Sequence, residues 1–191
     1  MIYEGLIEEA FAIVKGARDR YDGIPRAPIG RNPWNEIECG GHYARAMSSW
    51  SILTGAAGYE YDGVSKRVRF TPRVTPEKFK SFFVGPEGWG SLDQARKSVP
   101  DEGVTAQANM ICVIEGRLVV SDILLDPLGD VVKSELMVHL DAKDKAIEKI
   151  DATFELQPGG ILVKLAAPVT IKAGQELTIS FPSVSRNAIP Q

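Results

Sequence analysis

The sequence has 191 residues, 44% hydrophobic and 25% charged, a composition typical of soluble globular proteins with one large domain or two small ones. Its 22 Lys and Arg against 25 Asp and Glu give a net charge of -3, which excludes an overall basic field for nucleic acid or an anionic membrane. Two distant cysteines exclude a disulfide framework. An acidic N-terminus and the lack of an apolar run of about 18 residues exclude a signal peptide and a membrane-spanning helix. We therefore expect a cytoplasmic chain whose ligand is small or neutral.

The first predicted element is an amphipathic helix from about Gly5 to Tyr21. Apolar residues there recur at steps of three and four, which places them on one helical face: Leu6, Ile7, Ala10, Phe11, Val14, Ala17 and Tyr21. Gly23 suits a left-handed cap and Pro25 bars continuation. An irregular loop from Ile24 to Gly41 should follow, and long loops that are not simply polar are often functional.

A second helix is predicted from His42 to Thr54, ending by Gly55 to Gly58. Its apolar stripe consists of Tyr43, Ala46, Met47, Trp50 and Leu53. We expect the two helices to pack antiparallel, with Leu6, Ala10, Phe11 and Val14 against Met47, Trp50 and Leu53.

The remainder is predicted to be β-rich, beginning with a hairpin around Asp62-Gly63. Short alternating segments separated by Gly, Pro and Asp favour an antiparallel sandwich of six to nine strands, with strand structure across Met110 to Leu125 and Cys112 on the inner face. The predicted strands contain only two aromatics, Phe154 and Phe181, which favours a structural role over a carbohydrate-binding module. The expected fold is α+β, with residues 1–57 helical and residues 58–191 β-rich.

The segment RNPWNEIECGGHYAR, residues 31–45, concentrates the reactive side chains of the chain. Cys39 and His42 have a spacing that suits a metal, but they lack a second ligand pair, because His139 and Cys112 fall in predicted strands. Cys39 near a helix start also suggests an activated thiol, although no residue that would orient a base is evident. We favour a packed thiol and a hydrogen-bonded imidazole, and we expect no metal and no cofactor.

Glu36 and Arg45 are the third possibility, as sugar-binding groups. A carboxylate accepts hydrogen bonds from adjacent hydroxyls and a guanidinium donates to them, and charge strengthens both. Trp34, Tyr43 and Trp50 would provide flat surfaces for pyranose rings. From composition alone, an Arg-Glu pair that fixes the loop to the helix is the favoured interpretation.

The longer string RNPWNEIECGGHYARAMSSW, with GYEYDGVSKRVRFTPRVTPEKFKSFF and PEGWG after it and EEAFAIVKGARDRYDG before it, resembles glycoside hydrolase family 116. That family contains β-glucosidases and non-lysosomal glucosylceramidases. The resemblance covers about residues 4 to 96 and corresponds to the C-terminal end of the catalytic domain. It implies that the two helices are the terminal hairpin of an α/α toroid.

The resemblance also implies residue roles. In the family, the Glu of NE-x-E and the Arg of HYAR bind glucose hydroxyls, and these fall on Glu36 and Arg45. The residues expected to support the site are Trp34, Asn35, Glu38, His42 and Tyr43. The implied substrate is a β-glucoside or a glucosylceramide-like lipid, with contact to a membrane surface only if the aglycone is a lipid.

One departure from the family concerns catalysis. Its enzymes retain anomeric configuration with two carboxylates about 5 Å apart, and these lie upstream of the motif. We therefore expect a C-terminal fragment of such a hydrolase, inactive without the missing N-terminal part. The alternative is a non-catalytic carbohydrate-binding or interaction protein in which the β-rich region is the working part.

Overall fold

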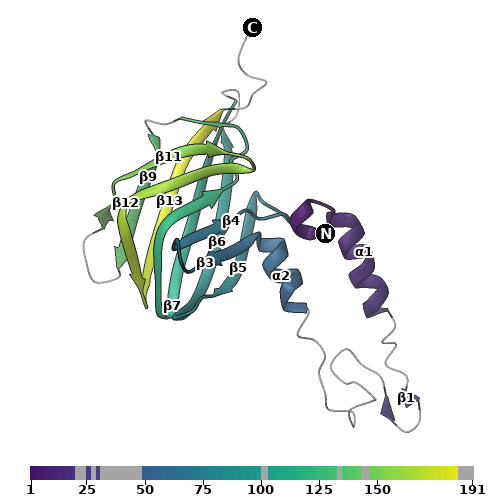
Figure 1. Cartoon of the computed structure of the whole chain (residues 1–191). Helices are drawn as coiled ribbons and strands as arrows, with labels where there is room; N and C mark the ends of the chain where they lie inside the picture. Colours follow the sequence, from purple (N-terminus) through teal and green to yellow (C-terminus); the bar gives the residue numbers. More distant parts are fainter. Residues whose placement is uncertain are drawn as a thin grey trace. The chain divides into compact units, whose positions relative to one another are not determined.

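The computed structural model describes residues 1–19, 25–26, 29–30, 49–99, 103–132, 135–142 and 147–184 (Figure 1). The chain divides into two compact units, Met1–Ala56 and Ala57–Gln191. The described residues are mostly β with two α-helices, which is α+β in the broad sense. No helix within the described ranges is long and apolar enough to cross a membrane.

The first unit contains short elements and most of the helical structure. They are the 3-10 helix η1 (Ile2–Glu4), helix α1 (Ile7–Arg18), the two-residue strands β1 (Pro25–Arg26) and β2 (Ile29–Gly30), and helix α2 (Ser49–Ala57). Gly5 ends η1 with a φ of 83°, and its N–H donates to the Ile2 carbonyl. The existence of both helices was predicted, but α1 ends earlier than expected, and residues 42–48 of the second predicted helix lie outside the described residues.

The predicted burial of the two helical stripes is wrong for Leu6, Phe11 and Trp50, and Met47 lies outside the described residues. Leu6 is 46% exposed, Phe11 38% and Trp50 59%, whereas Ala10 is buried. Near the end of α2, Gly55 lies against the Ile2 side chain, where an added Cβ would be 3.3 Å from the Ile2 Cβ. Ile2 precedes α1, so this contact does not cover Leu6 and Phe11, which remain exposed.

The second unit is one sheet of 11 strands, largely antiparallel and open. Its strands are β3 (Tyr59–Asp62), β4 (Arg67–Phe70), β5 (Lys78–Val84), β6 (Gly88–Val99), β7 (Val104–Leu125), β8 (Asp130–Val131), β9 (Met137–Ala142), β10 (Glu148–Lys149), β11 (Ala152–Gln157), β12 (Gly160–Lys172) and β13 (Gln175–Val184). The predicted hairpin at Asp62-Gly63 is confirmed as β3 and β4, and the predicted strand structure across Met110 to Leu125 is confirmed as part of β7.

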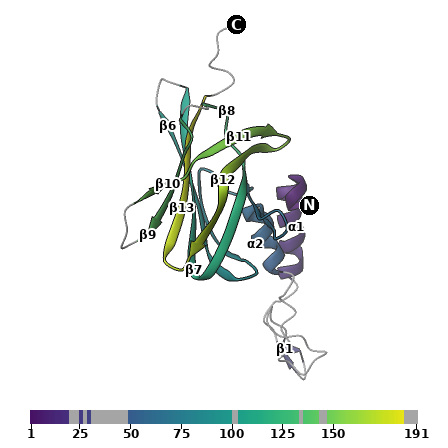
Figure 2. The same cartoon turned by 60° about the vertical axis from the view of Figure 1, so that its left-hand side comes forward.

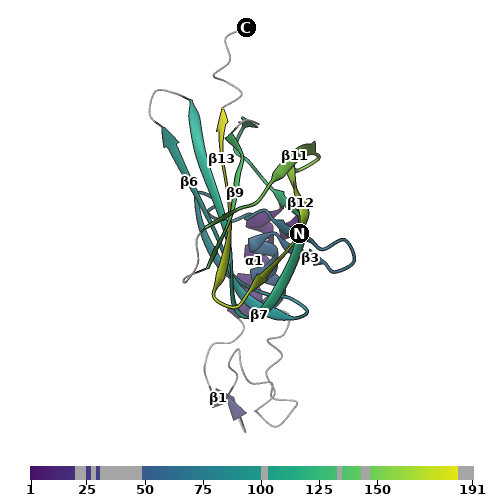
Figure 3. The same cartoon turned by 90° about the vertical axis from the view of Figure 1, so that its left-hand side faces the viewer.

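Strand β7 belongs to both halves of this sheet. Its first part pairs with β6 and β13, and its second part, from Arg117, pairs with β12 and β4. Figures 2 and 3 show β7 and β12 curving away from the plane of β13 and β9. The change of partners occurs at Gly116, which has a φ of 77°. A left-handed residue at this point re-aims the strand, which is why glycine suits it.

The two halves of the sheet enclose one hydrophobic core. Alternation along β5 turns Phe79 and Phe83 inward, and both halves contribute fully buried residues such as Phe70, Ile123, Leu177 and others. Each aliphatic or aromatic side chain of this kind contributes roughly 1.5 to 3 kcal/mol by leaving water. The core fixes which face of every strand remains outside.

Three predictions about the sheet require correction. The strand count exceeds the predicted six to nine, because β5, β6 and the two-residue strands were not recognised. The pairing of β4 with β7 is parallel, not antiparallel. Cys112 lies on the outer face and is only half-buried, because its neighbours Ile111 and Val113 take the inner positions in a period-two strand.

Candidate functional site

The residues predicted to bind glucose lie outside the described residues. This applies to Glu36 and Arg45 and to the supporting set Trp34, Asn35, Glu38, His42 and Tyr43. Their roles therefore stay predictions. The surfaces that can be built from described residues all belong to the second unit.

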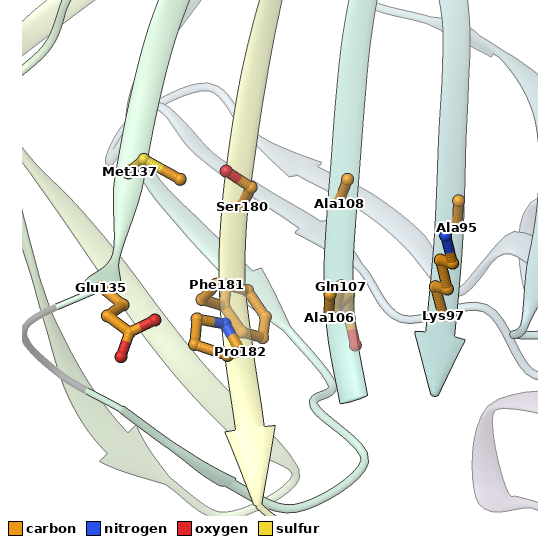
Figure 4. Close-up of a pocket in the computed structure, with 10 residues that line it drawn as sticks. All are labelled: Ala95, Lys97, Ala106, Gln107, Ala108, Glu135, Met137, Ser180, Phe181 and Pro182. Carbon is orange, nitrogen blue, oxygen red and sulfur yellow. The ribbon is translucent and has the colours of Figure 1, made fainter. Parts of the chain in front are cut away.

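A shallow cavity of about 390 Å³ lies on the outer face of the sheet where β6, β7, β13 and β9 run side by side. Figure 4 shows the side chains that line it: Ala95, Lys97, Ala106, Gln107, Ala108, Glu135, Met137, Ser180, Phe181 and Pro182. Small side chains at Ala95, Ala106 and Ala108 keep the floor low and apolar. The only charged groups of the lining are Lys97 and Glu135.

This cavity can accept an apolar group but offers no hydrolytic chemistry. A retaining glycosidase needs two carboxyl groups flanking the bond, and the lining contains a single carboxylate, Glu135. In the part of the chain that the structure describes, no three His, Cys, Asp or Glu side chains are grouped so as to hold a metal ion.

A second surface on the outer face is the ring platform, which we define as Phe82, Val84, Trp89 and Ile114. These residues come from the adjacent strands β5, β6 and β7, and their side chains are 38%, 65%, 43% and 51% exposed, respectively. Phe82 and Val84 alternate with the inward Phe79 and Phe83 on β5, and Ile114 follows the inward Val113 at the register shift between Trp89 and Gly90. Three neighbouring strands thus present two aromatic rings and two aliphatic groups on one face.

Sequence reasoning missed this surface. It counted Phe154 and Phe181 as the only aromatics on predicted strands, and the structure buries both, at 8% and 2% exposed. The signal was present in the segment KFKSFFV, where period two assigns Phe79 and Phe83 to one face and Phe82 to the other.

Polar groups border the ring platform. The indole Nε1 of Trp89 donates to Glu115 Oε2 at 3.4 Å. The Ser91 hydroxyl donates to Asp93 Oδ2 at 3.3 Å, and Lys80 Nζ lies 3.0 Å from Asp93 Oδ1. The lysine is therefore paired with a carboxylate, and the border includes the carboxylate oxygens of Glu115 and Asp93.

The interior of the same sheet contains a buried polar network. Asn109 Nδ2 donates to Gln94 Oε1 at 2.7 Å, and Gln107 Nε2 donates to Asn109 Oδ1 at 2.9 Å. Arg96 Nε donates to Gln107 Oε1 at 2.9 Å, and Gln94 Nε2 donates to the Pro76 carbonyl at 2.7 Å. Burial lowers the pKa of the Arg96 guanidinium. Because these groups satisfy one another, the network holds β6 against β7 and is not poised for a ligand.

A turn beside the ring platform is fixed by a paired charge. Arg117 Nη2 and Nε donate to Glu87 Oε1 and Oε2 at 2.7 and 3.0 Å, and the Arg117 backbone N–H donates to the Glu87 carbonyl at 3.0 Å. The hydrogen bond from Arg117 lowers the pKa of Glu87. This turn positions the start of β6, and with it Trp89.

Neither a protein-family model nor a curated protein matches this sequence.

Proposed function

We propose that this chain contributes the glucose-binding loop of a retaining β-glucosidase or glucosylceramidase-like hydrolase, with the nucleophile and the acid/base provided by other polypeptide. The observation that carries the proposal is the string NPWNEIECGGHYAR, in which Glu36 and Arg45 stand nine positions apart with Trp34 and Tyr43 as aromatic neighbours in sequence. Glu36 accepts hydrogen bonds from the sugar and Arg45 donates to it, and both are strengthened by charge. Neither residue carries a bond-breaking step.

The exposed helical side chains support this proposal. Leu6 at the N-cap of α1, Phe11 on α1 and Trp50 on α2 are exposed in the described structure. A helix with an apolar stripe buries it against another element in a stable protein, and in an α/α toroid the neighbouring helices would provide that cover. In the same proposal the helices are the last hairpin of the toroid, the sheet is a sandwich-like domain appended to it, and the enzyme is cytoplasmic.

Kinetics of two variants test the proposal. Glu36→Ala and Arg45→Ala are placed in the longer polypeptide restored with the upstream residues that contain the catalytic carboxylates. Each should lower kcat/KM for an aryl β-glucoside by roughly 10- to 100-fold, because an unpaired hydroxyl in a desolvated site costs about 1 to 3 kcal/mol. Cys39→Ala, the matched control within the loop, should change kcat/KM little. Wild-type kinetics in both variants would show that the loop is scaffold.

A second candidate is a non-catalytic carbohydrate-binding role for the β unit. The observation that favours it is the exposure of Phe82 and Trp89 on one face of the sheet, since sugar-binding faces use accessible rings. The two functions are compatible, because they use different units of the chain.

A further inference from the structure

We propose that the ring platform is a binding site for a neutral, β-linked glucose oligosaccharide. The inference rests on the second function proposed above and not on the glucose-binding loop. It starts from the placement of Phe82, Val84, Trp89 and Ile114 on one outer face.

The cross-strand register makes the platform continuous. Val84 lies opposite Trp89, and Phe82 lies opposite Ser91, in the pairing of β5 with β6. Trp89 lies opposite Glu115 in the pairing of β6 with β7. Neighbouring strands are about 4.8 Å apart, so side chains on three successive strands cover a width close to that of one or two pyranose rings.

The accessible area argues for a small ligand and against a protein partner. The exposed fractions of the four side chains correspond to roughly 350 Å² in all, because a whole aromatic side chain presents about 150 to 250 Å². A stable protein interface needs about 800 Å² from each partner. An apolar patch of this size on a single chain is of the kind that is often functional.

The chemistry of the border selects the class of ligand. Glu115 and Asp93 place carboxylate oxygens beside the rings, and these accept hydrogen bonds from hydroxyl groups. Lys80 is paired with Asp93, so the described border offers no cluster of cations for a phosphate or sulfate. A ligand with an apolar face and hydroxyl groups around its edge fits this arrangement.

A β-linked glucose chain has those two properties together. All ring substituents of β-glucopyranose are equatorial, so both faces of the ring present C–H groups while the hydroxyls point outward around the edge. One glucose unit would stack on Trp89 with hydroxyls directed to Glu115, and the next would lie over Phe82 near Ser91. A sugar with an axial hydroxyl would lose part of that contact.

The test is a titration of the 191-residue chain with cellotetraose, followed by ¹H–¹⁵N NMR at the Trp89 indole N–H in the wild type and at backbone N–H signals of β5 and β6 in the wild type and in every variant. We expect a saturable shift of the Trp89 signal, a loss of affinity of at least about tenfold in Trp89→Ala, and a smaller loss in Phe82→Ala. Leu156→Ala is the matched control: Leu156 is 73% exposed on β11, away from the platform residues, and its removal should leave the affinity unchanged.

Further variants keep the test decisive. Trp89→Phe retains a ring and should bind better than Trp89→Ala, and Glu115→Gln should bind less tightly than wild type because the charged acceptor is lost. Unchanged affinity in Trp89→Ala would overturn the proposal. So would the lack of any shift of the wild-type Trp89 signal at about 10 mM ligand, a concentration ten times a weak dissociation constant of about 1 mM. Binding abolished by Glu36→Ala but retained in Trp89→Ala would also overturn it, while supporting the glucose-binding loop.

Discussion

Substitution of Gly116 by alanine tests the way β7 passes between the two halves of the sheet. Gly116 has a φ of 77°, and a Cβ there would lie 2.1 Å from the Glu87 carbonyl oxygen and 2.7 Å from the Gly88 Cα. Both neighbours are backbone atoms, which cannot rotate away. The turn between β5 and β6 would have to move, and Arg117 would lose its backbone bond to Glu87.

The loss of unfolding free energy expected for Gly116→Ala is the sum of several costs. A left-handed conformation costs a non-glycine residue about 1 to 2 kcal/mol. A lost backbone hydrogen bond adds about 1 kcal/mol, and the exposed Glu87–Arg117 pair adds little. With the displaced turn, Gly116→Ala should lower the free energy of unfolding by about 3 to 5 kcal/mol, a large part of the usual total of about 5 to 15 kcal/mol.

Gly174 provides the matched control. Its φ is 80°, close to that of Gly116, but an added Cβ would meet no atom within 4 Å. Gly174→Ala should therefore cost only the conformational part, about 1 to 2 kcal/mol. Urea unfolding followed by the β-sheet circular dichroism signal compares the two variants. Equal losses in both would refute the close approach of Gly116 to the β5–β6 turn.

The remaining predictions concern the network and the hairpin turn. Gln107→Leu should lower the free energy of unfolding by about 1 to 3 kcal/mol, because it removes the acceptor of the part-buried Arg96 Nε and the donor to the buried Asn109 Oδ1. Thr178→Val on the outer face is its control and should cost less than about 1 kcal/mol in the same urea experiment; similar losses would contradict a role for the network. Ser65→Ala should raise the pKa of Asp62, whose carboxylate accepts a 2.6 Å bond from the Ser65 hydroxyl that lowers this pKa. Because the pKa of Asp62 is lowered in the folded state, the hydrogen bond stabilises the hairpin at pH values above the ordinary pKa of an aspartate. This stabilisation is lost as the pH falls through the lowered pKa of the folded state. A carboxyl ¹³C titration by NMR measures this, and an unchanged Asp62 pKa in Ser65→Ala would be the contrary result.

The elements that were predicted correctly are those that a strong local pattern marks in the sequence. The turn at Asp62-Gly63 identified β3 and β4, since Asp62 both accepts from the Val64 N–H and begins the turn. The periodicity of Leu6, Ala10 and Val14 identified α1. What surrounds a helix is decided by residues far away in sequence, so burial of its stripe could not be predicted from its own pattern.

The face of each strand was harder to predict for a physical reason. The run from Met110 to Ile114 is apolar at every position, so period two cannot show which side is the core, and Cys112 was assigned to the wrong face. Strand β6 contains Asp93, Gln94 and Arg96, and its buried polar residues are satisfied only by partners on β7. No local pattern shows such partners, which is why β6, and with it Trp89, was missed.

A crystal structure of the longer polypeptide with bound glucose would test the proposed glucose-binding loop. We expect a Glu36 carboxylate oxygen and an Arg45 guanidinium nitrogen each to lie within about 2.7 to 3.2 Å of hydroxyls of the same glucose. Glucose bound elsewhere, with Glu36 paired only to Arg45 and neither group touching the sugar, would contradict it.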